Sequence, residues 1–247
     1  MNPIEQFEIS NLKTLGNLGA YHFAFTNSAA YMLISLALIV GVTLYATRGA
    51  NLVPGRLQSA VELIYEFVAD TVRQSAGEEG MKFFPFVFSL FAFILVCNFI
   101  GLIPYSFTVT SQIIVTASLA LLVIGIVIVY GFWKNGLGFL HLFAPGGAPG
   151  WLMPLLIVIE VMSFLLRPLS LSVRLFANML AGHIALGVFA GFVAMLAGAG
   201  VWVILAPVPW LMTLALLPLE ALVAFLQAYV FAILTCIYLN DALHPHH

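Results

Sequence analysis

Arg174 lies within a stretch of sequence, Ser170 to Asn178, that is apolar enough to be buried in a bilayer. An arginine at the centre of a membrane helix costs about 2.5 to 3.5 kcal/mol on insertion scales. Guanidinium does not escape this cost by losing its proton. A charge kept at such a position indicates a functional site.

Other polar residues share the helical face of Arg174. At 100° per residue, one stripe within about 40° of Arg174 contains Glu160, Ser163, Arg167, Ser170 and Asn178. His183 falls about 180° away and faces a different environment. For Arg167 the alternative is a structural cation near the cytoplasmic side, whose head group reaches the interface.

The last apolar segment carries a second polar face. Thr213, Glu220 and Gln227 are spaced by seven residues, and Tyr238 falls near the same face. We expect the two polar faces to satisfy each other across a helical hairpin. The hydroxyl and amide side chains of these faces are also compatible with a purely structural role, in which they hydrogen-bond one membrane helix to another. Proton transfer is favoured by the titratable and charged members, Glu160, Arg167, Arg174, His183 and Glu220.

Arg174 itself does not pass a proton on, because it keeps its charge. It repels a passing proton and attracts a carboxylate. A mobile carboxylate on another subunit would be stabilised in its charged form beside Arg174. It would release its proton towards one side, pass the arginine and take up another proton from the other side.

The composition defines the elements that must position these residues. The chain is 63% hydrophobic and 7% charged, against about 25% charged residues in soluble domains. Its apolar runs are continuous, which predicts an all-α polytopic membrane protein rather than a β-barrel. We expect about five crossings, near residues 29–46, 83–104, 113–133, 151–197 and 210–239.

The fourth apolar segment is too long for a simple crossing. A helix over residues 151–197 would measure about 70 Å, against a hydrocarbon core of about 30 Å. It therefore either breaks, for example at Pro168, or lies strongly tilted. We predict one transmembrane domain over residues 1–247, with an N-terminal extramembrane segment over 1–28 and a proton-pathway hairpin over 151–240.

Residues 54–76 differ from the other segments. Val61, Ile64, Val68 and Val72 recur at helical spacing between charged residues. This pattern predicts an amphipathic helix in the membrane interface, the alternative being a surface helix of a cytoplasmic loop.

Basic residues set the expected orientation. Four of them, Arg48, Arg56, Arg73 and Lys82, lie between the first two crossings, and Lys134 follows the third. Residues 105–112 contain none. The positive-inside rule therefore predicts an external N-terminus and a cytoplasmic C-terminus.

The sequence indicates neither a cofactor nor a metal site. It lacks the Gly-x-x-x-x-Gly-Lys-Ser/Thr loop that binds nucleotide phosphates. Cys97 and Cys236 both lie in apolar runs and are interpreted as core residues. A net charge of −2 gives no reason to expect nucleic acid.

Three runs of sequence resemble one family. The run from Glu160 through Arg167-Pro168-Leu169-Ser170-Leu171-Ser172-Val173-Arg174 to His183 is similar to subunit a of the F-type ATP synthase. So are the run from Glu220 to Leu239 and the motif from Asn98 to Pro104. The resemblance covers most of the chain after about residue 80 and is most specific around Arg174.

The resemblance implies a stator subunit in the bacterial inner (plasma) membrane, without catalytic activity of its own. It would pack against a rotating ring of c subunits and assemble with b-type peripheral stalk subunits and the soluble ATPase head. Protons would pass through it between two half-channels and the ring. The long hairpin would lie strongly tilted along the ring.

The resemblance also implies residue roles. Arg174 matches the essential arginine, and Gln227 its neighbour across the hairpin. Glu160 matches the acidic residue of the cytoplasmic half-channel. His183 and Glu220 match the pair of residues in the opposite half-channel. We also expect Asn178, Ser170, Arg167 and Asn98 to lie along the pathway.

Two positions depart from the pattern of many members. Many bacterial members carry an acid where this chain has His183 and a histidine where it has Glu220, so proton transfer is assigned to the pair. Some members carry aspartate at the position of Gly101, which receives no proton role.

Two other functions fit a buried charge in a helical membrane protein. One is a self-contained proton-coupled secondary transporter, and the other is a structural scaffold subunit. Secondary transporters usually contain two inverted repeats, and the first half of this chain contains no second copy of the Arg174 block. Reconstitution distinguishes the functions, because only the stator needs a partner ring for proton flux.

Overall fold

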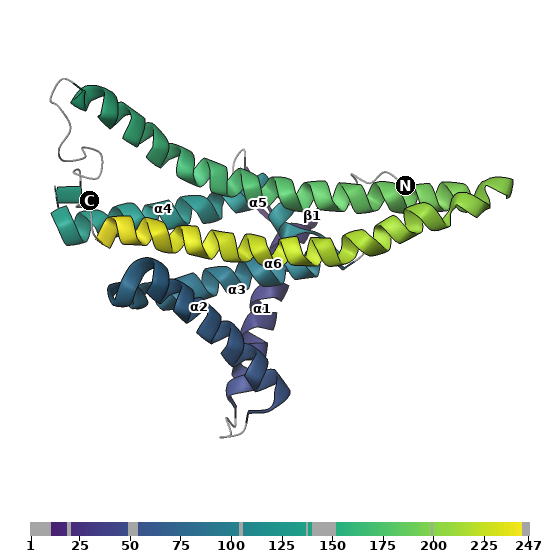
Figure 1. Cartoon of the computed structure of the whole chain (residues 1–247), viewed down its shortest axis with the longest axis horizontal. Helices are drawn as coiled ribbons and strands as arrows, with labels where there is room; N and C mark the ends of the chain where they lie inside the picture. Colours follow the sequence, from purple (N-terminus) through teal and green to yellow (C-terminus); the bar gives the residue numbers. More distant parts are fainter. Residues whose placement is uncertain are drawn as a thin grey trace. The chain divides into compact units, whose positions relative to one another are not determined.

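A computed structural model describes residues 11–18, 21–48, 54–103, 106–136, 138–139, 152–198 and 200–243. Its long helices are α1 (Asn27–Thr47), α2 (Arg56–Gly80), α3 (Phe84–Gly101), α4 (Ile113–Asn135), α5 (Met153–Ala197) and α6 (Pro207–Leu243) (Figure 1). Residues 1–10, Pro104, most of the loop after Lys134 and the closing histidines lie outside the described residues.

The prediction of an all-α polytopic membrane protein is confirmed. Five helical stretches of the described chain are long and apolar enough to cross a membrane: Asn27–Thr47, Arg56–Gly101, Ile113–Asn135, Met153–Ala197 and Val203–Leu243. They occur in the predicted order. Helices satisfy their backbone hydrogen bonds internally, which is what a bilayer requires.

Helix α5 is continuous over 45 residues, with Pro168 inside it. Its length is therefore about 68 Å, and the alternative of a break at Pro168 is wrong. Strong tilt remains the prediction for this helix. A short 3₁₀ helix, η5 (Gly200–Leu205), follows it, and Pro207 begins α6, where a missing N–H costs nothing.

Helix α2 is amphipathic, as the sequence predicts. Val68 and Val72 are buried, whereas Glu62, Glu66 and Asp70 are exposed. Gly77 has φ 67° and ψ −173° within α2, a left-handed conformation that favours glycine. The regular helix therefore ends at the predicted boundary near residue 76, while its position in the membrane interface stays a prediction.

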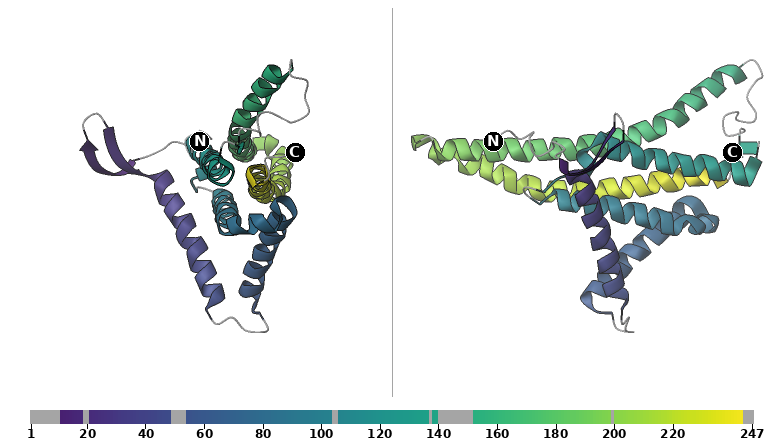
Figure 2. Two further views of the ribbon diagram at one scale, coloured as in Figure 1. Left: turned by 90° about the vertical axis from the view of Figure 1, so that its left-hand side faces the viewer. Right: turned by 180° about the vertical axis from the view of Figure 1, so that it is seen from behind.

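A β-hairpin precedes α1 and was not predicted. Strands β1 (Asn11–Leu18) and β2 (Tyr21–Thr26) pair antiparallel, and β2 leads directly into α1 (Figure 2). Tyr21, Phe23 and Phe25 alternate with other residues, which is the period of a strand. That alternation is the signal that sequence reasoning missed.

The chain forms two compact units. Unit 1 comprises Met1–Val42, Phe93–Gln112 and Leu175–Ala228, and unit 2 comprises Thr43–Ala92, Ile113–Arg174 and Tyr229–His247. The boundaries fall inside α1, α3, α5 and α6. The units are thus not successive stretches of sequence, and the single transmembrane domain stays a prediction.

Each unit has an apolar core. Buried core residues of unit 1 are Ile94, Phe107, Val109, Leu175 and Met179. In unit 2 they are Val68, Phe91, Val123, Val127 and Phe231. Large apolar side chains such as Leu155, Leu165 and Leu222 are exposed, as expected for surfaces that face lipid or partner subunits.

Candidate functional site

The polar stripe of α5 lies largely on an exposed face. Ser163, Ser170, Arg174 and Asn178 are exposed, whereas the packed face of the helix consists of Phe164, Leu171, Leu175 and Met179. Among the described residues, Arg174 takes part in none of the ion pairs. A permanent charge on an apolar helix surface requires a counter-group or water supplied from outside that surface.

A buried hydrogen bond fixes the rotation of α5 beside Arg174. The hydroxyl oxygens of Thr116 on α4 and Ser172 on α5 lie 3.1 Å apart, and both residues are buried. Ser172 is two residues before Arg174, about 160° around the helix. The bond therefore holds the back of α5 and directs Arg174 outward.

Unit 2 contains a cluster of compensated charges, which we name the Arg167 cluster: Glu160, Arg167, Tyr238 and Asp241. Arg167 donates from Nη1 to Oδ2 of Asp241 at 2.7 Å, and its Nη2 lies 3.7 Å from Oε1 of Glu160. The guanidinium also stands 5.2 Å from the ring centre of Tyr238, within cation–π range. The side chains of Arg167 and Asp241 are only 22% and 26% exposed. Arg167 is therefore a paired, half-buried cation, and its position relative to the membrane interface stays a prediction.

Unit 1 contains a different group of polar residues, which we name the His183 cluster: Asn98, Thr108, Thr110, His183 and Glu220. His183 on α5 is 8% exposed, and its Nε2 lies 3.1 Å from Oγ1 of Thr108, which is 2% exposed. Thr108 directly precedes the 3₁₀ helix η3 (Val109–Ser111). A segment distant in sequence thus supplies a partner for the imidazole.

Glu220 on α6 packs against the α5 residue next to His183. A Cβ atom added to Gly182 would overlap the Glu220 carboxylate. Glycine at this position therefore lets the carboxyl group approach the α5 backbone. This contact places Glu220 near the level of His183 along α5.

Several polar atoms of the His183 cluster are buried and have no hydrogen-bond partner among the described residues. Asn98 donates from Nδ2 to the carbonyl oxygen of Ala224 at 3.0 Å, which joins α3 to α6. Within the described chain no group bonds Oδ1 of Asn98, Oγ1 of Thr110 or either carboxyl oxygen of Glu220. Buried polar atoms are nearly always hydrogen-bonded. These atoms can therefore accept hydrogen bonds from water, and the carboxyl group of Glu220 can in addition take up a proton.

Comparison with known proteins identifies the family. The profile of "ATP synthase A chain" matches residues 29–240. ATP synthase subunit a of Rhodopseudomonas palustris strain BisA53 is 60% identical over 248 residues, covering 100% of both chains. Those of Xanthobacter autotrophicus and Bradyrhizobium diazoefficiens are each 62% identical, covering 100% of this chain and 99% of theirs. The chain belongs to the ATP synthase A chain family.

The polar faces of α5 and α6 differ in how far they are buried. The α6 residues Thr213, Glu220 and Gln227 are half-buried, and Tyr238 is buried. The α5 stripe around Arg174 instead remains exposed. Arg167 of the stripe contacts α6 through Asp241 and Tyr238, whereas Ser170, Arg174 and Asn178 are exposed. That the two polar faces satisfy each other around Arg174 stays a prediction.

Three members of these clusters, Asp241, Thr108 and Thr110, escaped sequence reasoning. Asp241 lies 14 residues after Gln227, so it continues the spacing of seven along α6, and that spacing could have revealed it. Thr108 gives no periodic signal, because it lies in a loop. Arg174 and Gln227 belong to different units, and their pairing stays a prediction. No three His, Cys, Asp or Glu side chains of the described residues gather as a metal site would require.

Proposed function

We propose that this chain moves protons between two half-channels and a ring of c subunits, with Arg174 separating the half-channels. The family supports the stator proton-channel function. The observation that carries the residue assignment is the exposed Arg174 on a continuous apolar helix. A carboxylate arriving from a neighbouring subunit can meet the guanidinium there, and its charged form is stabilised at that point.

The face of Arg174 supplies the polar surroundings of this meeting. Ser170 and Asn178 lie one turn before and after Arg174 and are exposed with it. They can exchange hydrogen bonds with the approaching carboxyl group. Gln227 is half-buried on α6, and we assign it the role of neighbour to Arg174 across the hairpin.

The Arg167 cluster forms the cytoplasmic half-channel in this proposal. Glu160 and Asp241 are half-buried carboxylates on either side of one guanidinium. Arg167 keeps both acids in place, and their partial exposure leaves them in contact with water. A proton released from the ring can move along such carboxylates.

The His183 cluster forms the opposite half-channel. His183 and Glu220 exchange protons as a pair, and the imidazole suits this because its ring nitrogens can both accept and donate a proton. The partnerless atoms of Asn98, Thr110 and Glu220 support a path through this cluster. They provide acceptor and donor positions beside apolar core residues of unit 1.

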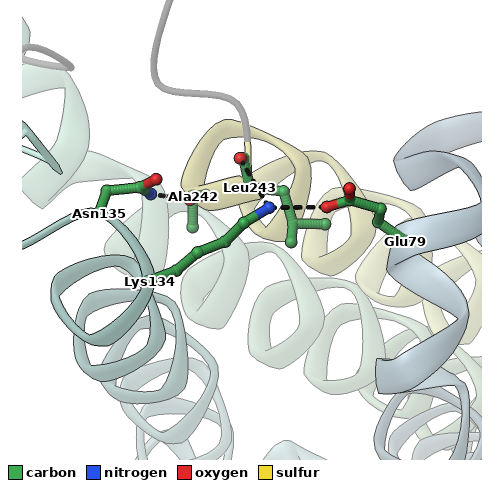
Figure 3. A network of polar contacts seen from close by, with 5 residues as sticks. All are labelled: Glu79, Lys134, Asn135, Ala242 and Leu243. Atoms are coloured by element: carbon green, nitrogen blue, oxygen red, sulfur yellow. Dashed lines mark hydrogen bonds and ion pairs between the residues drawn. The ribbon is translucent and has the colours of Figure 1, made fainter.

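Contacts within unit 2 support the predicted orientation. Lys134 donates from Nζ to Oε2 of Glu79 at 2.6 Å and to the carbonyl oxygen of Leu243 at 3.3 Å, and Asn135 donates to that of Ala242 at 2.7 Å (Figure 3). The ends of α2, α4 and α6 therefore meet. Because the basic loops after α1 and α4 are expected inside, the C-terminus of α6 is then cytoplasmic and the N-terminus external.

The chain is an integral membrane subunit of the ATP synthase complex, and its finer associations are part of the proposal. The α5 stripe faces the c-subunit ring, while the exposed apolar surfaces face lipid and b-type peripheral stalk subunits. The soluble head binds and hydrolyses the nucleotide. The complex resides in the bacterial inner membrane.

Reconstitution tests this function against a transporter and a scaffold. Purified chain is placed in vesicles with and without the c-subunit ring, and proton uptake is followed under an imposed potential. Each charge that crosses gains about 2.3 kcal/mol per 100 mV. We expect flux only when the ring is present. Flux from the chain alone would indicate a transporter, and absence of flux in both preparations would indicate a scaffold.

A further inference from the structure

We propose that Thr108 positions the imidazole of His183 for proton transfer, through the hydrogen bond between its hydroxyl group and Nε2. The two atoms lie 3.1 Å apart and both residues are buried. The inference rests on the proposed role of His183 in the half-channel. It assigns a role to a loop residue that itself carries no titratable group.

A hydroxyl group suits this position because it both donates and accepts hydrogen bonds. It donates to Nε2 when that nitrogen carries no proton and accepts from it when the nitrogen is protonated. The contact therefore survives every protonation state of the ring. A carboxylate at the same place would favour the protonated ring and oppose release of the proton.

The backbone around Thr108 is held rigidly. Ser111 donates from Oγ to the carbonyl oxygen of Thr108 at 2.7 Å, and its backbone N–H donates to the same oxygen at 3.3 Å. Both residues are buried. The hydroxyl group of Thr108 is thus presented to His183 from a fixed loop, as positioning of a proton-transfer group requires.

Gly101 at the end of α3 leaves the space that Thr108 occupies. A Cβ atom added to Gly101 would lie 2.8 Å from Cγ2 and 3.1 Å from Oγ1 of Thr108. Both atoms would have to move away. Gly101 is therefore a second determinant of the contact with His183, although it does not touch the imidazole.

The test uses the assembled complex in inverted membrane vesicles, with ATP-driven proton pumping as the measurement. Thr108→Val keeps the shape and removes the hydroxyl group, whereas Thr108→Ser keeps the hydroxyl group. We expect the valine variant to pump roughly threefold to tenfold more slowly, which is the range for one lost hydrogen bond. We expect the serine variant to stay within about twofold of the unaltered protein.

Thr235→Val is the matched control. Thr235 is fully buried, and its hydroxyl group donates to the carbonyl oxygen of Phe231 in its own helix at 2.8 Å. This variant should pump at the unaltered rate. Subunit content measured by blotting separates slow pumping from poor assembly in every variant.

A double substitution distinguishes positioning of His183 from packing. If Thr108 acts through the imidazole, Thr108→Val adds no further loss to His183→Ala. An equal additional loss in the double variant, or a serine variant as slow as the valine variant, would overturn the inference. If His183→Ala alone pumps normally, the proposed half-channel fails instead. If His183→Ala slows pumping and Thr108→Val does not, Thr108 alone has been misassigned.

Discussion

The Arg167 cluster and the His183 cluster handle polar groups in apolar surroundings in opposite ways. In the Arg167 cluster, a guanidinium is compensated by two carboxylates and stands over two aromatic rings. In the His183 cluster, the imidazole lies beside the neutral hydroxyl group of Thr108, and both oxygens of Glu220 lack a hydrogen-bond partner among the described residues.

This difference indicates what each cluster is suited to do. A paired charge stays charged, because its partner stabilises that form. A buried polar group that lacks a partner costs stability, and is kept where a function requires it. The Arg167 cluster is thus one in which charges are compensated by their neighbours, whereas the His183 cluster contains polar atoms that lack a partner among the described residues.

Arg174 belongs to neither cluster, and its substitution should have the largest effect. Arg174→Ala should abolish ATP-driven proton pumping, because no cation then stabilises the carboxylate arriving from the ring. Arg174→Lys should also fail, since a compact ammonium lacks the planar fork of guanidinium. Arg73→Ala, at an exposed arginine of α2, is the control and should pump normally. Coupled pumping by either Arg174 variant would contradict the account.

The next largest effect is expected in the His183 cluster. His183→Ala or Glu220→Ala should slow proton pumping by roughly a hundredfold, the usual contribution of a positioned acid or base. Subunit content should stay unchanged. The double exchange, His183→Glu with Glu220→His, should recover more pumping than either single exchange. Unaltered rates in both alanine variants would make the pair a structural contact.

Substitutions in the Arg167 cluster should affect stability more than those at exposed charges. Asp241→Asn should lower the free energy of unfolding by about 1 kcal/mol, because it removes the negative charge that lies 2.7 Å from the half-buried guanidinium of Arg167. Glu160→Gln, at 3.7 Å, should cost less. Thermal unfolding of the purified chain in detergent measures both. Equal losses of unfolding free energy in the two variants would show that the shorter contact does not stabilise the chain more than the longer one.

The smallest effect is expected at the end of α4. Lys134→Gln should destabilise the chain by less than about 1 kcal/mol, since Lys134 and Glu79 are 33% and 52% exposed. Lys82→Gln is the control, because Lys82 is exposed and makes no ion pair within the described chain. The two variants are compared in the same unfolding assay. A loss equal to that of Asp241→Asn would remove the distinction between exposed and half-buried pairs.

The helical periodicity of the sequence predicted much of this architecture. The positions around Arg174 could be placed on one face of α5 because 3.6 residues per turn fixes the angle between them. The end of the α2 helix near residue 76 was predictable from the charged and glycine-containing stretch that follows. Long apolar helices carry such signals because their packing is repetitive.

Contacts that depend on loops or on distant segments were not predictable in this way. Thr108 meets His183 although they are far apart in the sequence, and no periodicity relates a loop to a helix. Arg174 is exposed because the opposite face of α5 is packed, and that packing includes the Thr116–Ser172 hydrogen bond between two helices. The helical period predicted which residues share the face of Arg174. It did not predict whether that face is buried, because burial depends on which face of α5 the neighbouring helices cover.

Sided labelling of single cysteines tests most directly whether the two clusters open to opposite sides of the membrane. Cys97 and Cys236 are buried and are first replaced by alanine. Thr110→Cys or Asp241→Cys is then introduced, and a small membrane-impermeant thiol reagent is applied to right-side-out and inverted vesicles. The account predicts that the cysteine at position 110 reacts from the outside and the one at position 241 from the cytoplasmic side. Reaction of both from the same side would contradict two half-channels separated at Arg174.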